Sequence, residues 1–312
     1  MKIYTDINDI KIDGYVALTI GTFDGVHNGH KEILKVLLND AKSNNGESFV
    51  VTFFPHPRKV ISKNFPIKLL TTREEKIELF RNTGIDNLLI INFTEDFAKL
   101  GYDEFVKEYL VDAIKVNKVI IGFDHKFGKD RSGNESKLRE LGKQNGFDVE
   151  VVDEQTVRSA SVSSSIIRDA LCNGKIETAN ELLGSTYKLH GKVVEGAKRG
   201  RTLGFPTANI ELNNDDKLIP QAGVYFTGIY LGNEKFYGIM NIGYRPTFDD
   251  ELGIVIEVHI LDFNRDIYFE KISVELLYRM RDEKKFSSKE DLIAQITEDK
   301  NTAIEKLKLI VN

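Results

Sequence analysis

At 312 residues the chain exceeds what one hydrophobic core usually organises, so two domains are expected. Its net charge of −5 argues against a polyanion-binding surface, and we expect no nucleic acid partner. The single cysteine, Cys172, which we expect to be a buried structural thiol, excludes an internal disulfide and a multi-cysteine zinc site. No secretory signal or membrane-spanning apolar run is visible, so we expect a cytoplasmic protein without membrane partners.

The first half of the chain alternates short apolar runs with amphipathic helical patterns. The runs have the length of strands and lie at 15–20, 49–54, 88–93, 119–122 and 149–152. Helical stripes lie at 33–41 and 102–113. This alternation predicts an α/β fold with a parallel sheet covered on both faces. In such sheets ligands bind at the carboxyl ends of the strands.

The string GTFDGVHNGH, residues 21–30, follows the first predicted strand directly. A helix beginning near His30 would point free backbone N–H groups and its positive dipole end at that strand's terminus, which favours a phosphate. His27 and His30 are three residues apart and can face the same side. Two imidazoles there could donate hydrogen bonds to charge that develops on a phosphate. The alternative is a glycine-rich turn with two surface histidines, which this particular string disfavours.

The pattern changes after residues 183–184. From 187 to about 278 the runs alternate with period two and are rich in valine, isoleucine and tyrosine. The segments 224–230 and 236–240, joined by a turn at 232–234, predict a hairpin. Several such runs predict a small antiparallel β-barrel, and an apolar stripe from Leu292 to Ile310 predicts a final helix. We therefore place the domain boundary near Gly184, giving domains 1–184 and 185–312.

The residues 21–30 resemble the HxGH signature of nucleotidyltransferases, in the extended form that bacterial FAD synthetases carry. The segments 52–58 (TFFPHPR), 122–129 (GFDHKFGK) and 162–168 (VSSSIIR) look like further motifs of that family in the same order. The resemblance covers roughly residues 10–184. It implies a Rossmann-like domain that transfers an adenylyl group from ATP to FMN.

By this resemblance His27 and His30 are the catalytic residues that stabilise the transition state. It also implies a set of residues that bind the nucleotide or the flavin: Gly21, Thr22, Asp24, Gly29, Asp124, Ser163, Ser164 and Arg168.

Structural alternatives remain open for several of these residues. One serine of 163–165 is expected to cap a helix, which is compatible with a phosphate contact from the others. Arg168 suits a phosphate by charge and geometry but could be a solvated helix residue. Asp124 could orient a polar ligand edge or be a plain turn residue.

Two positions depart from the family pattern, and a third has no settled role. Ser165 stands where the family often has threonine, which keeps the hydroxyl group. Phe54 stands where several members carry an acid, so we assign it no catalytic role. His56 lies between two prolines and could be structural or contact a ligand.

The second half holds the string GAKRGRTLGFPTAN at 196–209. Its glycines and basic residues would suit a loop over a polyphosphate, although alone they could form an ordinary basic turn. A GxxxxGK[ST] phosphate-binding loop is absent from the sequence. The segment GRTLGFPTANI looks like the riboflavin kinase signature, whose central element is PTAN, and 241–248, 257–263 and 281–286 look like further motifs of that family. This resemblance covers about residues 185–312.

The second resemblance implies that Thr207 and Asn209 hold Mg²⁺ and the nucleotide phosphates, since Mg²⁺ demands oxygen ligands. It places Gly196 and Gly200 in the nucleotide-binding loop and makes Arg281 a flavin contact, although Arg281 could instead be a surface charge.

Glu257 lies in the alternating run 254–261. A carboxylate there could accept the proton of a substrate hydroxyl that attacks phosphorus, and the resemblance assigns it this role of base. The alternative is a cross-strand partner of a lysine.

Together the two halves resemble the family of bacterial bifunctional riboflavin kinases and FAD synthetases (FMN adenylyltransferases). The expected substrates are ATP, riboflavin and FMN, with Mg²⁺ as cofactor. One rival is an HxGH nucleotidyltransferase with another phosphate acceptor, which would leave the second half unexplained. The other is a flavin-binding regulator without turnover, which would have no use for a base such as Glu257.

Overall fold

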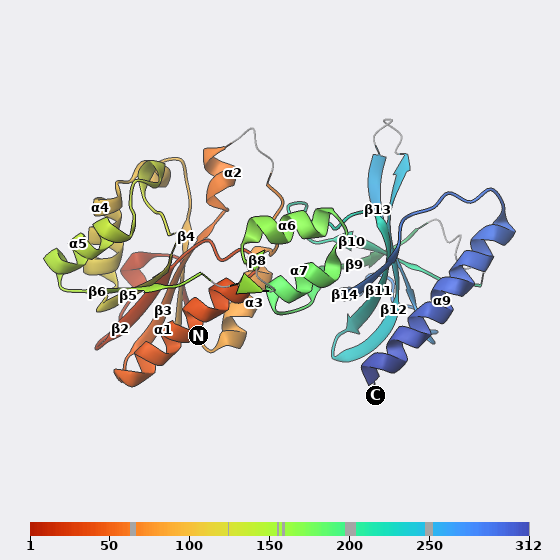
Figure 1. Ribbon diagram of the computed structural model, residues 1–312, viewed down its shortest axis with the longest axis horizontal. Coiled ribbons are helices and arrows are strands. Elements are labelled where there is room, and N and C mark those ends of the chain that lie inside the picture. The colour runs from red at the N-terminus through yellow and green to blue at the C-terminus, as the bar shows by residue number, and fades with distance from the viewer. Residues whose placement is uncertain are drawn as a thin grey trace. The chain divides into compact units, whose positions relative to one another are not determined.

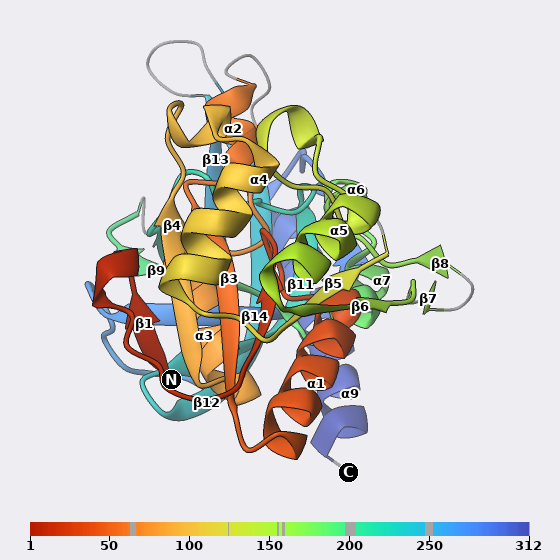
Figure 2. The ribbon, with the colours of Figure 1, turned by 90° about the vertical axis from the view of Figure 1, so that its left-hand side faces the viewer.

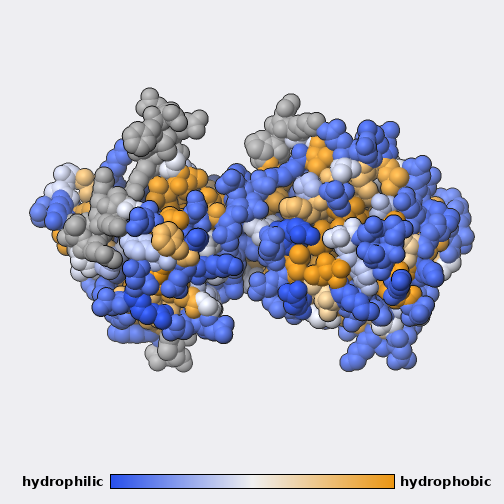
Figure 3. All heavy atoms as spheres, turned by 180° about the vertical axis from the view of Figure 1, so that it is seen from behind, coloured by the Kyte–Doolittle hydropathy of each residue, from blue (hydrophilic) through white to orange (hydrophobic). Residues whose placement is uncertain are grey.

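A computed structural model describes residues 1–62, 67–123, 125–154, 156–157, 160–196, 204–246 and 252–311 (Figure 1). By its internal contacts the chain divides into two compact units, Met1–Ser164 and Ser165–Asn312. No helix within these described ranges is long and apolar enough to cross a membrane. The face drawn in Figure 3 is largely hydrophilic, with apolar areas on both units.

The first unit is built on a six-stranded parallel sheet with the order β1-β4-β3-β2-β5-β6 (Figure 2). Its strands are β1 (Lys2–Tyr4), β2 (Val16–Ile20), β3 (Glu47–Phe54), β4 (Asn87–Asn92), β5 (Lys118–Gly122) and β6 (Asp148–Val152). The five strands expected from apolar runs are confirmed. The sequence did not predict β1, a three-residue edge strand paired with β4.

Helices cover both faces of this sheet (Figure 1). They are α1 (Asn28–Ser43), α2 (Pro57–Ile61), α3 (Arg73–Thr83), α4 (Tyr102–Phe105) with a π-helical continuation (Val106–Ala113), and α5 (Glu135–Asn145). Single 3₁₀ turns lie at Ile7–Asp9, Phe97–Lys99 and Lys129–Arg131, and a short hairpin is formed by β7 (Thr156–Val157) and β8 (Ala160–Ser161).

Alternate residues of β2 pack into the two layers. Ala17 contacts the layer that contains Leu37 of α1 and Phe80 of α3. The next residue, Leu18, contacts the layer that contains Leu110 and Leu138. This is the two-sided burial that the near-continuous apolar runs predict.

The second unit contains a closed antiparallel barrel with the order β10-β13-β12-β11-β14-β9. Its strands are β9 (Tyr187–Val194), β10 (Ala208–Leu212), β11 (Gly223–Leu231), β12 (Glu234–Pro246), β13 (Leu252–Ile260) and β14 (Lys271–Arg281). The predicted hairpin is β11–β12, with Gly232 of its turn at φ 58°. The predicted final helix is α9 (Lys289–Val311), which packs Ala303 against Val224 and Phe226 of the barrel.

Two helices, α6 (Ser164–Cys172) and α7 (Ile176–Leu183), precede the barrel. The expectation that Cys172 is buried is wrong, because this thiol is exposed. Helix α6 buries Ile167, Ala170 and Leu171, which form a stripe at helical spacing, and Cys172 falls outside that stripe.

Leu37→Ala should lower the free energy of unfolding of the first unit by about 3 kcal/mol. The reason is that Leu37 is fully buried between α1 and the sheet, so that truncation leaves a cavity. Urea denaturation followed by circular dichroism measures the change. Lys35→Ala on the exposed side of α1 is the control. Equal losses in the two variants would contradict the assigned core.

Candidate functional site

The GTFDGVHNGH segment lies where the strand order of the parallel sheet reverses. Strand β2 pairs with β3 on one side and with β5 on the other. After β2 the chain first adds β3 and β4 on one side, and it then crosses to the other side of β2 to add β5 and β6. Gly21 follows the end of β2, and β5 ends at Gly122. In open α/β sheets, such a switch point is the usual place of a ligand-binding crevice.

His27 is the N-cap of α1, which begins at Asn28, two residues earlier than expected. The backbone N–H of His30 donates a hydrogen bond to Nδ1 of His27 (3.4 Å). In the neutral imidazole the proton of His27 therefore lies on Nε2, which leaves Nε2–H as a donor. Gly29 allows this close packing, because a Cβ at this position would lie 3.3 Å from the His27 ring, which is a tight contact.

The two histidine rings are stacked, with their centroids 3.6 Å apart and an interplanar angle of 18°. The His30 ring also meets the Phe23 ring edge-on, at 5.0 Å between centroids. Burial, and then the positive charges that His27 and Lys76 can carry, hold the pKa of His30 well below its ordinary 6.5. His30 is therefore neutral at neutral pH. Its buried Nδ1 has no hydrogen-bond partner among the described residues.

Thr22 and Asp24 anchor the loop between β2 and α1 to the segment 70–76. The Asp24 carboxylate is buried and accepts hydrogen bonds from the backbone N–H groups of Leu70 and Thr71 (3.0 Å each) and from the Thr71 hydroxyl (3.0 Å). The Thr22 carbonyl accepts a hydrogen bond from Nζ of Lys76 (2.7 Å). These hydrogen bonds hold the loop against residues 70–76. A ligand contact by Asp24 or Thr22 stays a prediction.

Thr71 and Lys76 contribute to this loop although no sequence motif predicts them. One local signal was present: Thr72 and Glu75 form a capping box that marks the start of α3. Nothing in the sequence, however, distinguishes Lys76 from the exposed charged residues around it.

The serine segment also reaches this loop. Ser164, the first residue of α6, donates its hydroxyl to the backbone carbonyl of Asp24 (2.9 Å). The carbonyl of Val162 lies 3.7 Å from the position that a Cβ on Gly29 would take. Ser163 lies between these two residues. Residues 162–164 therefore adjoin the beginning of α1.

The remaining predicted residues of this half divide into three cases. Arg168 lies on α6, one turn after Ser164. Asp124 lies outside the described residues. His56 is buried and caps α2, where its Nδ1 accepts a hydrogen bond from the backbone N–H of Arg58 (3.2 Å), which supports its structural alternative.

In the barrel, Asn209, Glu257 and Asn241 form one row across β10, β13 and β12. Asn209 pairs with Glu257, and Glu257 pairs with Asn241. The residues next to them in sequence (Ile210, Ile256 and Ile242) are buried. Because side chains alternate across a strand, the three polar residues share the opposite, half-buried face.

Gly196 and Asn209 approach each other closely, because a Cβ on Gly196 would lie 2.0 Å from Nδ2 of Asn209. Thr207 precedes β10 and is half-buried. The hydroxyl of Thr207 and the carboxamide oxygen of Asn209 are donors that suit Mg²⁺, which keeps few protein ligands. Among the described residues no group of three or more His, Cys, Asp or Glu side chains could hold a metal ion. Gly200 lies outside these residues.

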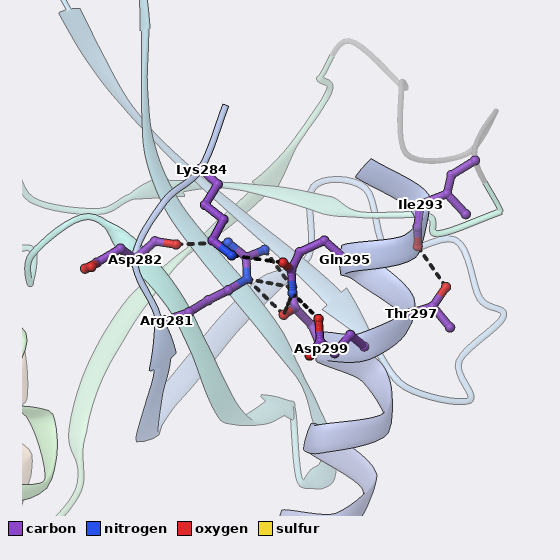
Figure 4. Close-up of polar contacts among 8 residues, drawn as sticks. Arg281, Asp282, Lys284, Ile293, Gln295, Thr297 and Asp299 are labelled. Atoms are coloured by element: carbon purple, nitrogen blue, oxygen red, sulfur yellow. Dashed lines mark hydrogen bonds and ion pairs between the residues drawn. The ribbon is translucent and has the colours of Figure 1, made fainter. Parts of the chain in front are cut away.

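Arg281, at the end of β14, is joined to α9 (Figure 4). Its Nε and Nη2 donate to the two carboxylate oxygens of Asp299 (2.9 and 2.7 Å), and its Nη1 donates to the carbonyl of Asp282 (2.9 Å). Asp299 is buried, so this ion pair links the strand to the helix. The contact between Arg281 and a flavin stays a prediction.

A pocket of about 430 Å³ lies between α9 and the segment that follows β14. Its lining includes Phe286 and Gln295. Gln295 donates a hydrogen bond to Asp299, the partner of Arg281, and accepts one from Lys284 (3.2 Å each). The pocket thus adjoins the Arg281 ion pair.

Comparison with known proteins identifies both halves. A family model described as FAD synthetase matches residues 9–166, and one described as riboflavin kinase matches residues 183–307. Three similar proteins are each named bifunctional riboflavin kinase/FMN adenylyltransferase. That of Listeria monocytogenes is 41% identical over 95% of this chain and 91% of its own length. That of Buchnera aphidicola is 39% identical over 96% of this chain and 96% of its own length. That of Bacillus subtilis is 38% identical over 92% of this chain and 91% of its own length.

A similar fold is seen in the crystal structure of a Streptococcus pneumoniae protein named macrolide-efflux protein. It superposes with a TM-score of 0.89 at 30% identity and covers 97% of this chain and 98% of its own.

We predict that the His30 imidazole remains neutral at neutral pH and titrates well below pH 6.5. Nitrogen-detected NMR of the imidazoles measures this, with a His30→Gln spectrum to assign the signals. Since the unfolded chain binds a proton at His30 near pH 6.5 and the folded chain does not, the free energy of unfolding should fall as the pH drops below that value. A His30 signal that titrates at or above pH 6.5 would contradict the assigned environment.

Proposed function

The chain belongs to the family of bifunctional riboflavin kinase/FMN adenylyltransferases, and from this premise we propose which residues perform its two reactions. The enzyme phosphorylates riboflavin with ATP to give FMN. It then transfers an adenylyl group from a second ATP to FMN, which gives FAD and pyrophosphate. The observation that carries the residue assignment is the stacked pair of His27 and His30 at the N-terminus of α1, where β2 ends at the switch point of the sheet.

We assign adenylyl transfer to residues 1–184 and riboflavin phosphorylation to residues 185–312. The FAD synthetase match ends at 166 and the riboflavin kinase match starts at 183, which supports this division. The boundary at Gly184 coincides with the end of α7, where Gly184 takes a left-handed conformation. A nucleotidyltransferase with another acceptor would leave the second match without a role.

In the first unit, the N-terminus of α1 receives the phosphates of ATP. The free N–H groups and the dipole of the helix attract the anion, and Gly21 and Gly29 let the backbone approach it. An oxygen of the FMN phosphate attacks the α-phosphorus of ATP, and the bond from that phosphorus to the pyrophosphate oxygen breaks. His27 and His30 stabilise the charge that develops, and His27 does so by donating Nε2–H.

Ser163, Ser164, Arg168 and Asp124 are the further ligand contacts in this proposal. The hydrogen bond from the Ser164 hydroxyl to the carbonyl of Asp24 supports this assignment only by placing the serine segment beside the start of α1. We assign Thr22 and Asp24 to holding the loop, with contact to the nucleotide through their backbone.

In the second unit, Glu257 accepts the proton of the ribityl hydroxyl of riboflavin while that oxygen attacks the γ-phosphorus of ATP. Asn209 and Asn241 flank Glu257 in the same row of the barrel. Thr207 and Asn209 would hold Mg²⁺, which when bound neutralises the charge of the nucleotide phosphates. Gly196 and Gly200 belong to the loop that covers these phosphates.

We place the flavin ring of riboflavin in the pocket beside Arg281. Phe286 in the lining of this open hollow offers an aromatic surface to the ring. Arg281 holds α9 through Asp299, which positions one wall of this pocket. A cytoplasmic location, where these small substrates would be met, also remains our proposal.

His27→Ala should lower the rate of FAD formation from FMN by about 10²- to 10³-fold, the usual cost of removing one donor to transition-state charge. In a chromatographic time course with riboflavin, ATP and Mg²⁺, the wild-type chain should form FMN first and FAD after it. The variant should form FMN at the wild-type rate and accumulate it. Loss of both activities in a folded variant would count against separate sites.

Glu257→Gln should lower the rate of riboflavin phosphorylation by about 10²- to 10⁴-fold, because the base is removed while its shape is kept. FAD formation from supplied FMN should be unchanged. Glu234→Gln, at an exposed position of the β11–β12 turn, is the matched control. A Glu257→Gln variant that phosphorylates riboflavin at the normal rate would show that Glu257 is not the base.

A further inference from the structure

Lys76 is a buried cation directly beneath the loop that connects β2 to α1. Its side chain is only 8% exposed, although it belongs to a helix rich in charged residues. Its Nζ donates a hydrogen bond to the backbone carbonyl of Thr22 (2.7 Å). Burial of an ammonium group is costly, and a backbone carbonyl neutralises none of its charge. A methionine would fill this place without that cost, so the charge calls for a reason beyond packing.

The carbonyl that Lys76 holds lies at the centre of a set of loop contacts. The hydroxyl of Thr52, on β3, donates to the same Thr22 oxygen (3.2 Å). The backbone N–H of Gly25 donates to the hydroxyl of Thr71 (3.2 Å), and Thr71 in turn binds Asp24. Hydrogen bonds with residues 70–76 therefore fix residues 22–25. The chain continues from there to His27, the N-cap of α1.

The charge of Lys76 affects the protonation of His30, which follows the loop. It is one of the causes that lower the pKa of His30, after burial and His27. Burial lowers the pKa of Lys76 itself to about 8, and the nearby Asp24 carboxylate opposes this only in part. The Asp24 carboxylate also accepts hydrogen bonds from the backbone N–H groups of residues 70–71 and from the Thr71 hydroxyl. The ammonium group thus adds positive potential under the place where α1 begins.

We propose that Lys76 is a positioning residue for adenylyl transfer, which fixes the Thr22 carbonyl and supplies positive charge beneath the loop that receives the nucleotide phosphates. The inference rests on the proposed role of that loop and of His27 and His30. Lys76 acts through the loop and needs no contact with substrate. Its removal should therefore affect the rate of the chemical step more than the folding of the unit.

The test compares Lys76→Met, Lys76→Gln and Lys76→Arg with the control Lys35→Met, which removes an exposed lysine of α1. Methionine removes both the charge and the donor, glutamine keeps an N–H donor, and arginine keeps both. We expect kcat for FAD formation from FMN to fall about 10- to 100-fold in Lys76→Met, the scale of a misplaced catalytic group. The KM for ATP should change much less. Lys76→Gln should lie between Lys76→Met and the wild type, and Lys76→Arg should recover part of the rate.

Two further readouts separate this role from a structural one. Thermal unfolding of Lys76→Met should stay close to that of the wild type, because the variant no longer buries a charge. In imidazole NMR, the pKa of His30 should rise in Lys76→Met and Lys76→Gln and stay unchanged in Lys76→Arg. Riboflavin phosphorylation should be unchanged in all variants.

A wild-type kcat in both neutral variants, or a His30 pKa that does not respond to them, would overturn the proposal. If Lys76→Met does not fold, Lys76→Gln and the His30 titration still decide it. Failure of the proposed function would look different, because the wild-type chain would then form no FAD from FMN and ATP.

Discussion

The first unit depends on how the N-terminus of α1 is capped. His27 uses one ring nitrogen to accept the N–H of His30 and leaves the other as a donor. The same contact brings the two imidazoles into a stack, in which a positive charge on His27 makes protonation of His30 less favourable. The residue that caps the helix thereby adds to the effect of burial, which is the main cause of the low pKa of His30. His30 is therefore neutral at neutral pH, so that its ring can take part in hydrogen bonds but does not attract an anion as an imidazolium ion.

The barrel reaches its polar site by alternation within strands. Its interior takes Ile210, Ile242 and Ile256, and the residue beside each of them is turned to the other face as a carboxamide or a carboxylate. The packing that closes the barrel is therefore also what aligns Asn209, Glu257 and Asn241. No insertion or special loop is needed to bring these three together.

Local pattern accounts for most of the fold and for the motifs of the site. The buried parallel strands are predicted by apolar runs in the sequence, and the β11–β12 hairpin is predicted by two alternating runs on either side of a turn. The features that the sequence does not predict depend on partners that are distant along the chain. The strand β1 exists because its three residues pair with β4, and Lys76 is buried because of which side of α3 meets the loop. Arg281 is tied to Asp299, eighteen residues away on another element, and no local pattern foretells that pairing.

The ion pair between Arg281 and Asp299 has a consequence for the modularity of the barrel. Helix α9 covers Val224 and Phe226 and supplies the buried counter-ion of a strand residue. A shortened chain without this helix would expose an apolar face and leave a guanidinium group without its carboxylate at the same spot. The closed barrel by itself is thus an incomplete folding unit. In any natural or artificial recombination of the two halves, the kinase would have to be transplanted together with its last helix.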